Sequence, residues 1–575
     1  MHIPYLESRP EQIQSQDLFF GLNHSLRLRE GEFYDMENLS SDLFPVLSPR
    51  KPRGLIRENC RMDGMIQREG LAWVEEGKLY LNGRAMDIKL DGPGPRQLVN
   101  MGAYLLIFPD KKYFNTANPL DHGSLEAETI TNAPVIAIPC NLDGSEIVIG
   151  HKGKEAPQNP ADQSYWLDTV SGKLKQYASA TELWVVITTP YVKLQCAGMG
   201  KGFSPYDGVE ISGDPKLGDL AGATILYGCG EDYLIFPGLL GEKTTFTQPV
   251  KTERKMPIMD FVVESGNRLW GCRYGPNDRG EIVNEIYCSK LGDFKNFRCF
   301  LGISTDSYTA SLGSDGPFTG AAAYGGYPIF FKENSLHKVF GQRPANFQIQ
   351  TTACRGVSPG CASSLAIVRE VLYYKAVHGI CAYDGSLPRE VSVPLGMEPE
   401  GVAVAAGLHG KYYVSMEKAG EYQLYVYDTV RNLWHKEDKL HAKLLCACRE
   451  DVFCLTEDGR LLSLLGTTGQ KEKAVSWMGE TGIIGVTLSG NKYLGKISLR
   501  MQLSPGSWVS VEAEYDSSGQ WEHLGTVQGM SLRSFQIPVI PRRCDHLRLR
   551  LRGRGRVLLF AAARSLRPGS AAISD

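Results

Sequence analysis

Short runs of alternating apolar and polar residues, separated by turn signals, recur along most of the chain. Residues 70–84 read GLAWVEEGKLYLNGR, an apolar run, a Glu-Gly turn and a second alternating run, which predict a β-hairpin. Long amphipathic helices are nearly absent from the pattern. The strand pairs group into about seven modules of roughly 30–45 residues. These modules lie near residues 60–90, 93–128, 257–302, 316–352, 361–396, 400–440 and 442–470.

Modules of this size are typical of the four-stranded blades of a β-propeller. Several contain an Asp in a turn, followed by an aromatic residue that returns to the sheet, as in Asp293 with Phe297 and Asp428 with Trp434. An Asp side chain can bond the backbone two residues on, and the aromatic residue can fill the space between blades. We therefore expect an all-β fold organised around a β-propeller.

Three segments interrupt or flank this pattern. Residues 129–255 exceed one module and predict an inserted β-rich domain, in which 173–189 suits either a helix or a strand. After about residue 473, four strand candidates (492–501, 507–515, 533–540, 547–560) predict a C-terminal β-sandwich. The expected domains are an extended arm at 1–59, the propeller at 60–128 and 256–472, the insertion at 129–255, and the sandwich at 473–575.

Composition narrows the class of protein. The chain has 575 residues, of which 62 are Lys or Arg and 64 are Asp or Glu, so its formal charge of −2 argues against a general nucleic-acid coat. An apolar fraction of 42% excludes a disordered chain. The sequence contains no run of 18 apolar residues, so we expect no membrane span. The first residues lack the pattern of a signal peptide. The 14 cysteines form no Cys-x-x-Cys pair and are expected to be reduced and buried.

The sequence lacks several common motifs of catalytic and phosphate-binding sites. The sequence holds no Gly-x-Ser-x-Gly, no His-Glu-x-x-His and no phosphate-binding Gly-x-x-x-x-Gly-Lys. His435, His441, Cys446 and Cys448 lie close together, but the two cysteines would share one face of a strand, which favours core filling over a zinc site. Residues 436–447 could also form a short helix. We expect no enzymatic activity, and no catalytic, cofactor-binding or metal-binding residues.

The least usual electrostatic feature lies near the C-terminus. Residues 547–557 read LRLRLRGRGRV, so a strand there places the arginines on one face and the leucines on the other. Five like charges in a row destabilise a sheet unless acids or phosphates face them. Three interpretations are open: a solvated face with neighbouring acids, a contact between subunits or proteins, and a contact with DNA. The residues concerned are Arg548, Arg550, Arg552, Arg554 and Arg556.

The first 59 residues carry apolar side chains without the periodicity of a self-contained core. They are therefore expected to pack on the propeller or on an adjacent subunit. The aromatic candidates for this interface are Phe19, Phe20, Phe33 and Phe44.

Four stretches resemble virion structural proteins of tailed bacteriophages. Residues 21–50, GLNHSLRLREGEFYDMENLSSDLFPVLSPR, resemble the opening arm of tail-hub and tail-nozzle proteins of the tail tubular protein B and packaged-DNA stabilisation types. Residues 292–320 and 330–341 (FFKENSLHKVFG) are similar to blades of phage structural proteins. Residues 535–546 (FQIPVIPRRCDH) are similar to their last domain.

The resemblance implies a non-enzymatic protein that forms a ring, commonly six-fold, below the portal and adaptor of the virion tail. Its expected partners are further copies of itself, the portal-adaptor or other tail proteins, and the packaged double-stranded DNA. Its expected location is the virion tail, assembled in the host bacterial cytoplasm, without membrane insertion. The alternative is a glycan-binding or glycan-cleaving β-propeller, and a third class is an intracellular propeller scaffold.

Overall fold

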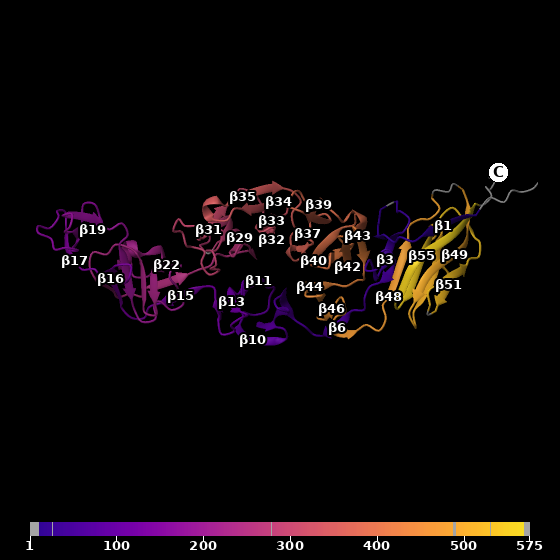
Figure 1. Ribbon diagram of the computed structural model, residues 1–575, viewed down its shortest axis with the longest axis horizontal. Helices are drawn as coiled ribbons and strands as arrows, with labels where there is room; N and C mark the ends of the chain where they lie inside the picture. The colour runs from indigo at the N-terminus through magenta and orange to yellow at the C-terminus, as the bar shows by residue number, and fades with distance from the viewer. Residues whose placement is uncertain (1–10, 26, 278, 487–489, 530, 569–575) are drawn as a thin grey trace, which may run out of the picture. The chain divides into compact units, whose positions relative to one another are not determined.

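The computed structural model describes residues 11–25, 27–277, 279–486, 490–529 and 531–568 (Figure 1). These residues form an all-β protein with short 3-10 helices at Pro215–Leu220, Pro344–Asn346, Ala362–Ser364 and Val393–Leu395. No helix among them is long and apolar enough to cross a membrane. The chain divides into two compact units. Unit one comprises Met1–Pro95, Phe331–Leu336 and Thr352–Asp575, and unit two comprises Arg96–Phe330 and His337–Thr351.

Outside the insertion and the C-terminal sandwich, the described residues form seven sheets of at least four strands. In six of them, the four strands follow one another in the chain, because each turn joins neighbouring strands. These are β7–β10 (Met62–Gln67, Leu71–Glu75, Lys78–Leu81, Arg84–Lys89), β11–β14 (Gln97–Met101, Tyr104–Phe108, Lys112–Asn115, His122–Ser124), β28–β31 (Phe261–Glu264, Leu269–Pro276, Ile282–Cys288, Tyr308–Ser311), β32–β35 (Phe318–Tyr324, Tyr327–Lys332, Ser335–Phe340, Gln348–Ala353), β36–β39 (Ala366–Val368, Val371–Lys375, Ile380–Tyr383, Arg389–Glu390) and β40–β43 (Glu400–Leu408, Lys411–Lys418, Glu421–Asp428, Leu433–Lys436).

The seventh sheet is assembled from both ends of this array. Strands β44 (Ala442–Cys448), β45 (Asp451–Thr456) and β46 (Leu461–Ser463) follow one another, and β6 (Gly54–Arg57) then pairs antiparallel with β46. Strand β47 (Gln470–Lys471) adds to the other side of β6. A Cβ at Gly54 would overlap the Thr468 carbonyl oxygen, so this pairing requires glycine. The residues that could have formed a short helix, 436–447, instead comprise the end of β43, a connection at 437–441 and most of β44.

Successive sheets share apolar cores within each unit, because each sheet must bury both faces against a neighbour. In unit one, β40–β43 packs on the seventh sheet, and the seventh sheet packs on β7–β10. In unit two, β11–β14 packs on β28–β31, which packs on the part of β32–β35 that belongs to this unit. The cores are represented in that order by Val426 and Val452, Leu461 and Trp73, Leu106 and Leu269, and Cys272 and Phe330.

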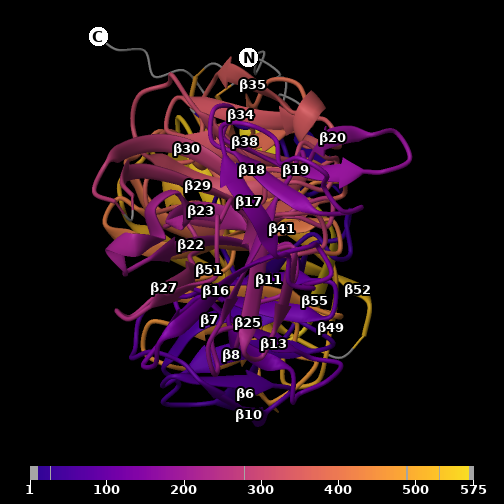
Figure 2. The same ribbon diagram turned by 90° about the vertical axis from the view of Figure 1, so that its left-hand side faces the viewer.

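The insertion lies in unit two and forms three sheets (Figure 2). Its first strand, β15 (Ala127–Ile130), pairs antiparallel with its last, β27 (Lys251–Arg254). The sheet β15-β27-β22-β23 and the sheet β24-β25-β21-β16-β26 share a core that includes Ala137, Val192, Ile211 and Leu234. These strands are β16 (Val135–Cys140), β21 (Tyr191–Gln195), β22 (Gly208–Ser212), β23 (Gly222–Ile225), β24 (Gly228–Gly230), β25 (Tyr233–Pro237) and β26 (Thr244–Phe246).

The third sheet of the insertion has the order β17-β18-β19-β20. Its strands are β17 (Ile149–Gly153), β18 (Tyr165–Asp168), β19 (Lys173–Ala178) and β20 (Leu183–Val186). The stretch 173–189, for which a helix or a strand was open, therefore forms two strands.

The C-terminal sandwich lies in unit one and includes strands from the arm. One sheet has the order β1-β55-β49-β52, with β53 also paired to β49, and the other has the order β2-β3-β48-β54-β50-β51. The arm strands are β1 (Gln12–Gln16), β2 (Gly21–Leu22) and β3 (Glu32–Glu37), and a two-stranded β4 (Leu39–Ser40) and β5 (Ser48–Pro49) follow. The others are β48 (Ser476–Thr481), β49 (Lys492–Leu503), β50 (Trp508–Tyr515), β51 (Trp521–Gln528), β52 (Arg533–Pro538), β53 (Arg543–Cys544), β54 (Leu547–Arg554) and β55 (Val557–Pro568).

The arm thus differs from the extended segment that the sequence indicated. Its strands β3 and β1 pair with β48 and β55, which lie more than 400 residues away in the chain. A local sequence pattern therefore could not predict these arm strands. The predicted strand 547–560 is likewise two strands, because Gly555 adopts a φ of 83° and turns the chain between β54 and β55.

Candidate functional site

The arginine row lies on β54, in the middle of a sheet. Its leucines are buried in the sandwich, and its arginines face the other way. Arg548 donates to Glu480 on β48 at 2.6 Å and to Glu514 on β50 at 2.6 Å. Arg550 donates to Glu512 at 2.6 Å, and its guanidinium lies 4.0 Å from the ring centroid of Trp521. The neighbouring strands therefore supply the acids that this part of the row needs.

The row changes character toward its C-terminal end. Arg552 is exposed and lies 3.4 Å from Glu512, a carboxylate that already pairs with Arg550. Arg554 and Arg556 are exposed, and within the described ranges no carboxylate lies within ion-pair distance of either. The sequence carried the signal for two of the acids, since Glu512 and Glu514 alternate within the predicted strand 507–515. Only the end of the row, from Arg552 to Arg556, is available to a partner.

We predict that the two ends of the row respond differently to neutralisation. The double variant Arg554→Gln and Arg556→Gln should leave the free energy of unfolding within about 0.5 kcal/mol of wild type, because both side chains are exposed. The variant Arg548→Gln should lose about 2 kcal/mol, because it leaves the buried Glu514 without its charged donor. Urea denaturation of the three proteins compares them, and equal losses would contradict the assignment.

The arm aromatics occupy two different environments. Phe19 and Phe33 are buried in the sandwich, with ring centroids 6.2 Å apart. Phe20 and Phe44 are half-buried, with centroids 6.3 Å apart, and Arg29 and Arg431 lie over their rings. Of the four interface candidates, Phe19 and Phe33 therefore fill the chain's own core, and Phe20 and Phe44 remain near the surface.

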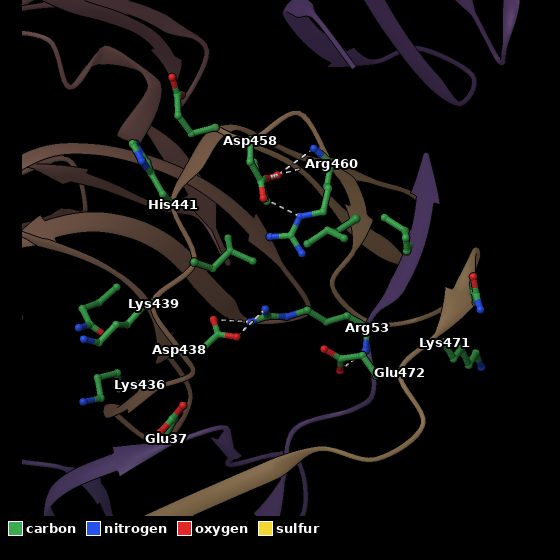
Figure 3. A pocket seen from close by; sticks show the side chains of 17 residues that line it. Glu37, Arg53, Lys436, Asp438, Lys439, His441, Asp458, Arg460, Lys471 and Glu472 are labelled. Atoms are coloured by element: carbon green, nitrogen blue, oxygen red, sulfur yellow. Dashed lines mark hydrogen bonds and ion pairs between the residues drawn. The ribbon is translucent and has the colours of Figure 1, made fainter. Parts of the chain in front are cut away.

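The largest cleft that we describe has a volume of about 1060 Å³ and lies in unit one, between the sheet β40–β43 and the seventh sheet. Its wall is strongly charged (Figure 3). The charged residues and the one histidine that line it are Glu37, Arg53, Lys436, Asp438, Lys439, His441, Glu457, Asp458, Arg460, Lys471 and Glu472.

A buried ion cluster forms the floor of this cleft. Arg53, next to β6, donates to Glu437 at 2.7 Å and to Asp438 at 2.8 Å. Arg50 donates to Glu472 at 2.7 Å. Burial opposes the charge of Arg53, but the carboxylates of Glu437 and Asp438 outweigh it and raise the pKa of Arg53. The cluster therefore fastens β6 to the connection that follows β43.

Two of the cleft carboxylates, Asp458 and Glu472, are poorly suited to acid catalysis. Asp458 accepts hydrogen bonds from Thr456 and Arg460, and the Thr456 bond is the main cause that lowers its pKa. Glu472 is partly desolvated, but its hydrogen bond from Arg50 lowers its pKa. A glycosidase acid needs a raised pKa, so that it is protonated when it meets the leaving group. Neither carboxylate has that property.

The histidine and cysteine residues between 435 and 448 lie in different environments. Cys446 and Cys448 are buried on one side of β44, and all 14 cysteines of the chain are free thiols. His441 stacks on Tyr422 with ring centroids 3.4 Å apart. His435 is buried, and this desolvation lowers its pKa to about 3. Among the described residues, no group of three or more His, Cys, Asp and Glu could hold a metal ion.

We predict a loss of stability in mild acid that depends on His435. Its pKa is lower in the folded state than the ordinary 6.5, so the unfolded chain takes up a proton first as the pH falls. The free energy of unfolding should therefore drop by about 2 kcal/mol between pH 6.5 and 5 from this group. The variant His435→Gln should lose this component, and His441→Gln should keep it. Urea midpoints of the wild type and both variants, measured at both pH values, test this prediction. An equal change in midpoint between the two pH values in all three proteins would contradict it.

No protein-family model matches the chain, and no curated protein matches it. The extracellular domain of a one-component system from B. thetaiotaomicron is 9% identical, with 93% of this chain and 98% of that chain covered and a TM-score of 0.28. An exo-β-1,3-galactanase from Phanerochaete chrysosporium is 6% identical, with 53% of this chain and 95% of that chain covered and a TM-score of 0.20. Likenesses at these TM-scores carry no argument about activity.

Proposed function

We propose that the chain is a non-enzymatic structural protein of a tailed-phage virion. In this proposal the seven sheets close into a β-propeller, and copies of the chain form a ring, six-fold in number, in the tail hub or nozzle below the portal and adaptor. The ring retains the packaged DNA and forms its exit channel. The assignment to a phage rests on the resemblance in residues 21–50, 292–320, 330–341 and 535–546.

The observation that supports the proposal most is the role of the resembling arm inside unit one. After pairing with β48, the arm continues onto the sheet β40–β43. The Asn38 amide donates to the Glu437 carbonyl at 2.6 Å, and the Ser41 hydroxyl donates to Asp428 at 2.6 Å. The Lys436 ammonium donates to Asp35 at 2.5 Å. An arm that ties a terminal domain to a stiff body suits a protein that bears mechanical load.

Closure into a propeller has its own support. Strand β6 precedes the first sheet in sequence and completes the last, which ties the two ends of the array together. Propellers have short, protected edges, and this makes them stiff units. Rings then require a heterologous contact, in which two different patches of each subunit meet. The exposed end of the arginine row, Arg552 to Arg556, is our candidate for one of these patches.

Electron microscopy of the purified full chain, together with light scattering over a range of concentrations, tests the proposal. Rings with a central opening are expected, and the double variant Arg554→Gln and Arg556→Gln should form fewer of them at the same concentration. A protein that stays monomeric at all concentrations and binds or cleaves bacterial surface glycan would overturn the proposal in favour of the glycan alternative.

A further inference from the structure

The inserted domain ends in an unusual sheet edge. Strand β20 is the last strand of the sheet β17-β18-β19-β20, and no strand in the described part of the chain pairs with its outer side (Figure 2). Its sequence is Leu-Trp-Val-Val, and Ile187, which follows it, still donates its amide to the Leu174 carbonyl. Leu183, Val185 and Val186 are 62%, 52% and 38% exposed. An apolar edge strand in contact with water favours pairing with another strand.

The backbone of this edge has hydrogen-bonding groups that point outward. The Ile187 amide donates to the Leu174 carbonyl, so residues 187, 185 and 183 exchange hydrogen bonds with β19. In an antiparallel ladder such pairs alternate with pairs that do not bond. The N–H and C=O groups of Trp184 and Val186 therefore face away from the sheet.

The opposite edge of the same sheet is protected by ordinary means. Strand β17 includes His151 and Lys152, and its pairing with β18 shifts register between Ile149 and His151. Charged side chains and bulges at an edge discourage pairing with other strands. Residues 183–187 have neither a charge nor a proline. Because only the β17 edge is protected in this way, we infer that another strand covers the β20 edge in the assembled protein.

We propose that β20 pairs antiparallel with β20 of a second copy of this chain, across a two-fold axis. Placing Val185 opposite Val185 of the second copy lets Trp184 and Val186 of each strand exchange hydrogen bonds with Val186 and Trp184 of the other. Leu183 then lies opposite Ile187. Glu182 lies opposite Thr188, so no like charges meet.

Side chains support this register on both faces of the sheet. Trp184 already packs on Tyr177 and Trp166, with ring centroids 5.3 and 5.4 Å away, so its rotamer is held before pairing. The contact is apolar on its other face through Leu183, Val185 and Ile187.

A single strand pair is smaller than a standard stable interface, so the dimer alone is weak and depends on concentration. The proposal does not depend on the phage assignment.

A cysteine pair tests the register directly. In the two-fold arrangement, residue 185 of each strand forms a pair without backbone hydrogen bonds, with Cα atoms about 4.5 Å apart. That separation lies within the range of a disulfide. The full-length variant Val185→Cys should form a disulfide-linked dimer under mild oxidation. The matched variant Val170→Cys, whose residue is 72% exposed in the β18–β19 turn, should remain uncrosslinked.

A charge variant provides the second measurement. Val185→Lys places two ammonium groups opposite each other and should raise the dissociation constant of the dimer at least about tenfold, as measured by sedimentation velocity. Val170→Lys should leave it unchanged, and neither variant should lower the melting temperature, because both side chains are exposed. Crosslinking of Val185→Cys that is no faster than that of Val170→Cys overturns the proposal, as does a dimer that Val185→Lys leaves intact. If wild type forms rings while these results are negative, the proposed function stands and the edge pairing fails.

Discussion

The variant Arg53→Met is expected to lower the free energy of unfolding of unit one by about 3–5 kcal/mol. Arg53 is 5% exposed and is the main partner of Glu437, which is 7% exposed. Removing the guanidinium leaves the buried Glu437 carboxylate with only the longer contact to Arg50, whose Nε lies 3.6 Å away. A buried charge that has lost its main partner costs more than the pair itself contributes. The loss should be seen as a lower urea midpoint in the transition that reports on the seventh sheet.

The matched control is Arg460→Met in the wall of the same cleft. Arg460 and Asp458 form an ion pair at 2.9 Å, but their side chains are 49% and 59% exposed. Exposed pairs contribute at most about 1 kcal/mol, so this variant should behave almost like wild type. If both variants lose the same stability, the buried cluster does not hold β6 in place.

The second large effect is expected for Phe33→Ala, with a loss of about 3–5 kcal/mol. Phe33 is 3% exposed on β3, and its ring packs on Phe19 and approaches Gly479 on β48. Truncation leaves a cavity where the arm enters the sandwich. The thermal transition of the sandwich, followed by near-ultraviolet circular dichroism, should move to lower temperature.

Phe44→Ala separates this burial effect from a general effect of changing the arm. Phe44 is half-buried and contacts Phe20 and Arg431. Its loss should cost clearly less than that of Phe33. A Phe33→Ala protein that melts like wild type would mean that the arm does not belong to the core of the sandwich.

Local pattern in the sequence was a good guide to the sheets. Each stretch predicted as a strand module contains most strands of one of the seven sheets, because alternation and turn residues act between neighbours in the chain. Two sheets extend beyond their expected modules: the third continues to Ser311, beyond the expected 302, and the seventh includes β6, outside the expected 442–470. The same logic placed the arginines of β54 on one face and its leucines in the core.

Pairings between distant segments could not be foreseen. Strand β6 is four residues long, and it is defined as a strand by β46, about 400 residues further on. The same holds for β1 and β3, whose partners are β55 and β48. Glu480 was not connected with Arg548, since β48 was not expected as a strand. The ion cluster at Arg53 was missed for this reason too: its charges come from segments that meet only when β6 closes the sheet.

The pairing of β15 with β27 has a consequence for how this chain can evolve. Ile130 and Lys251 are cross-strand partners, so the insertion leaves the host fold and returns to it at adjacent points. A two-residue hairpin turn could connect these strands in place of everything between them. Any domain with neighbouring termini could equally be substituted there, as tolerated domain insertions generally require. A single recombination cassette would thus give the same scaffold a new outer domain, and with it a new partner, while the sheets that support it remain unaltered.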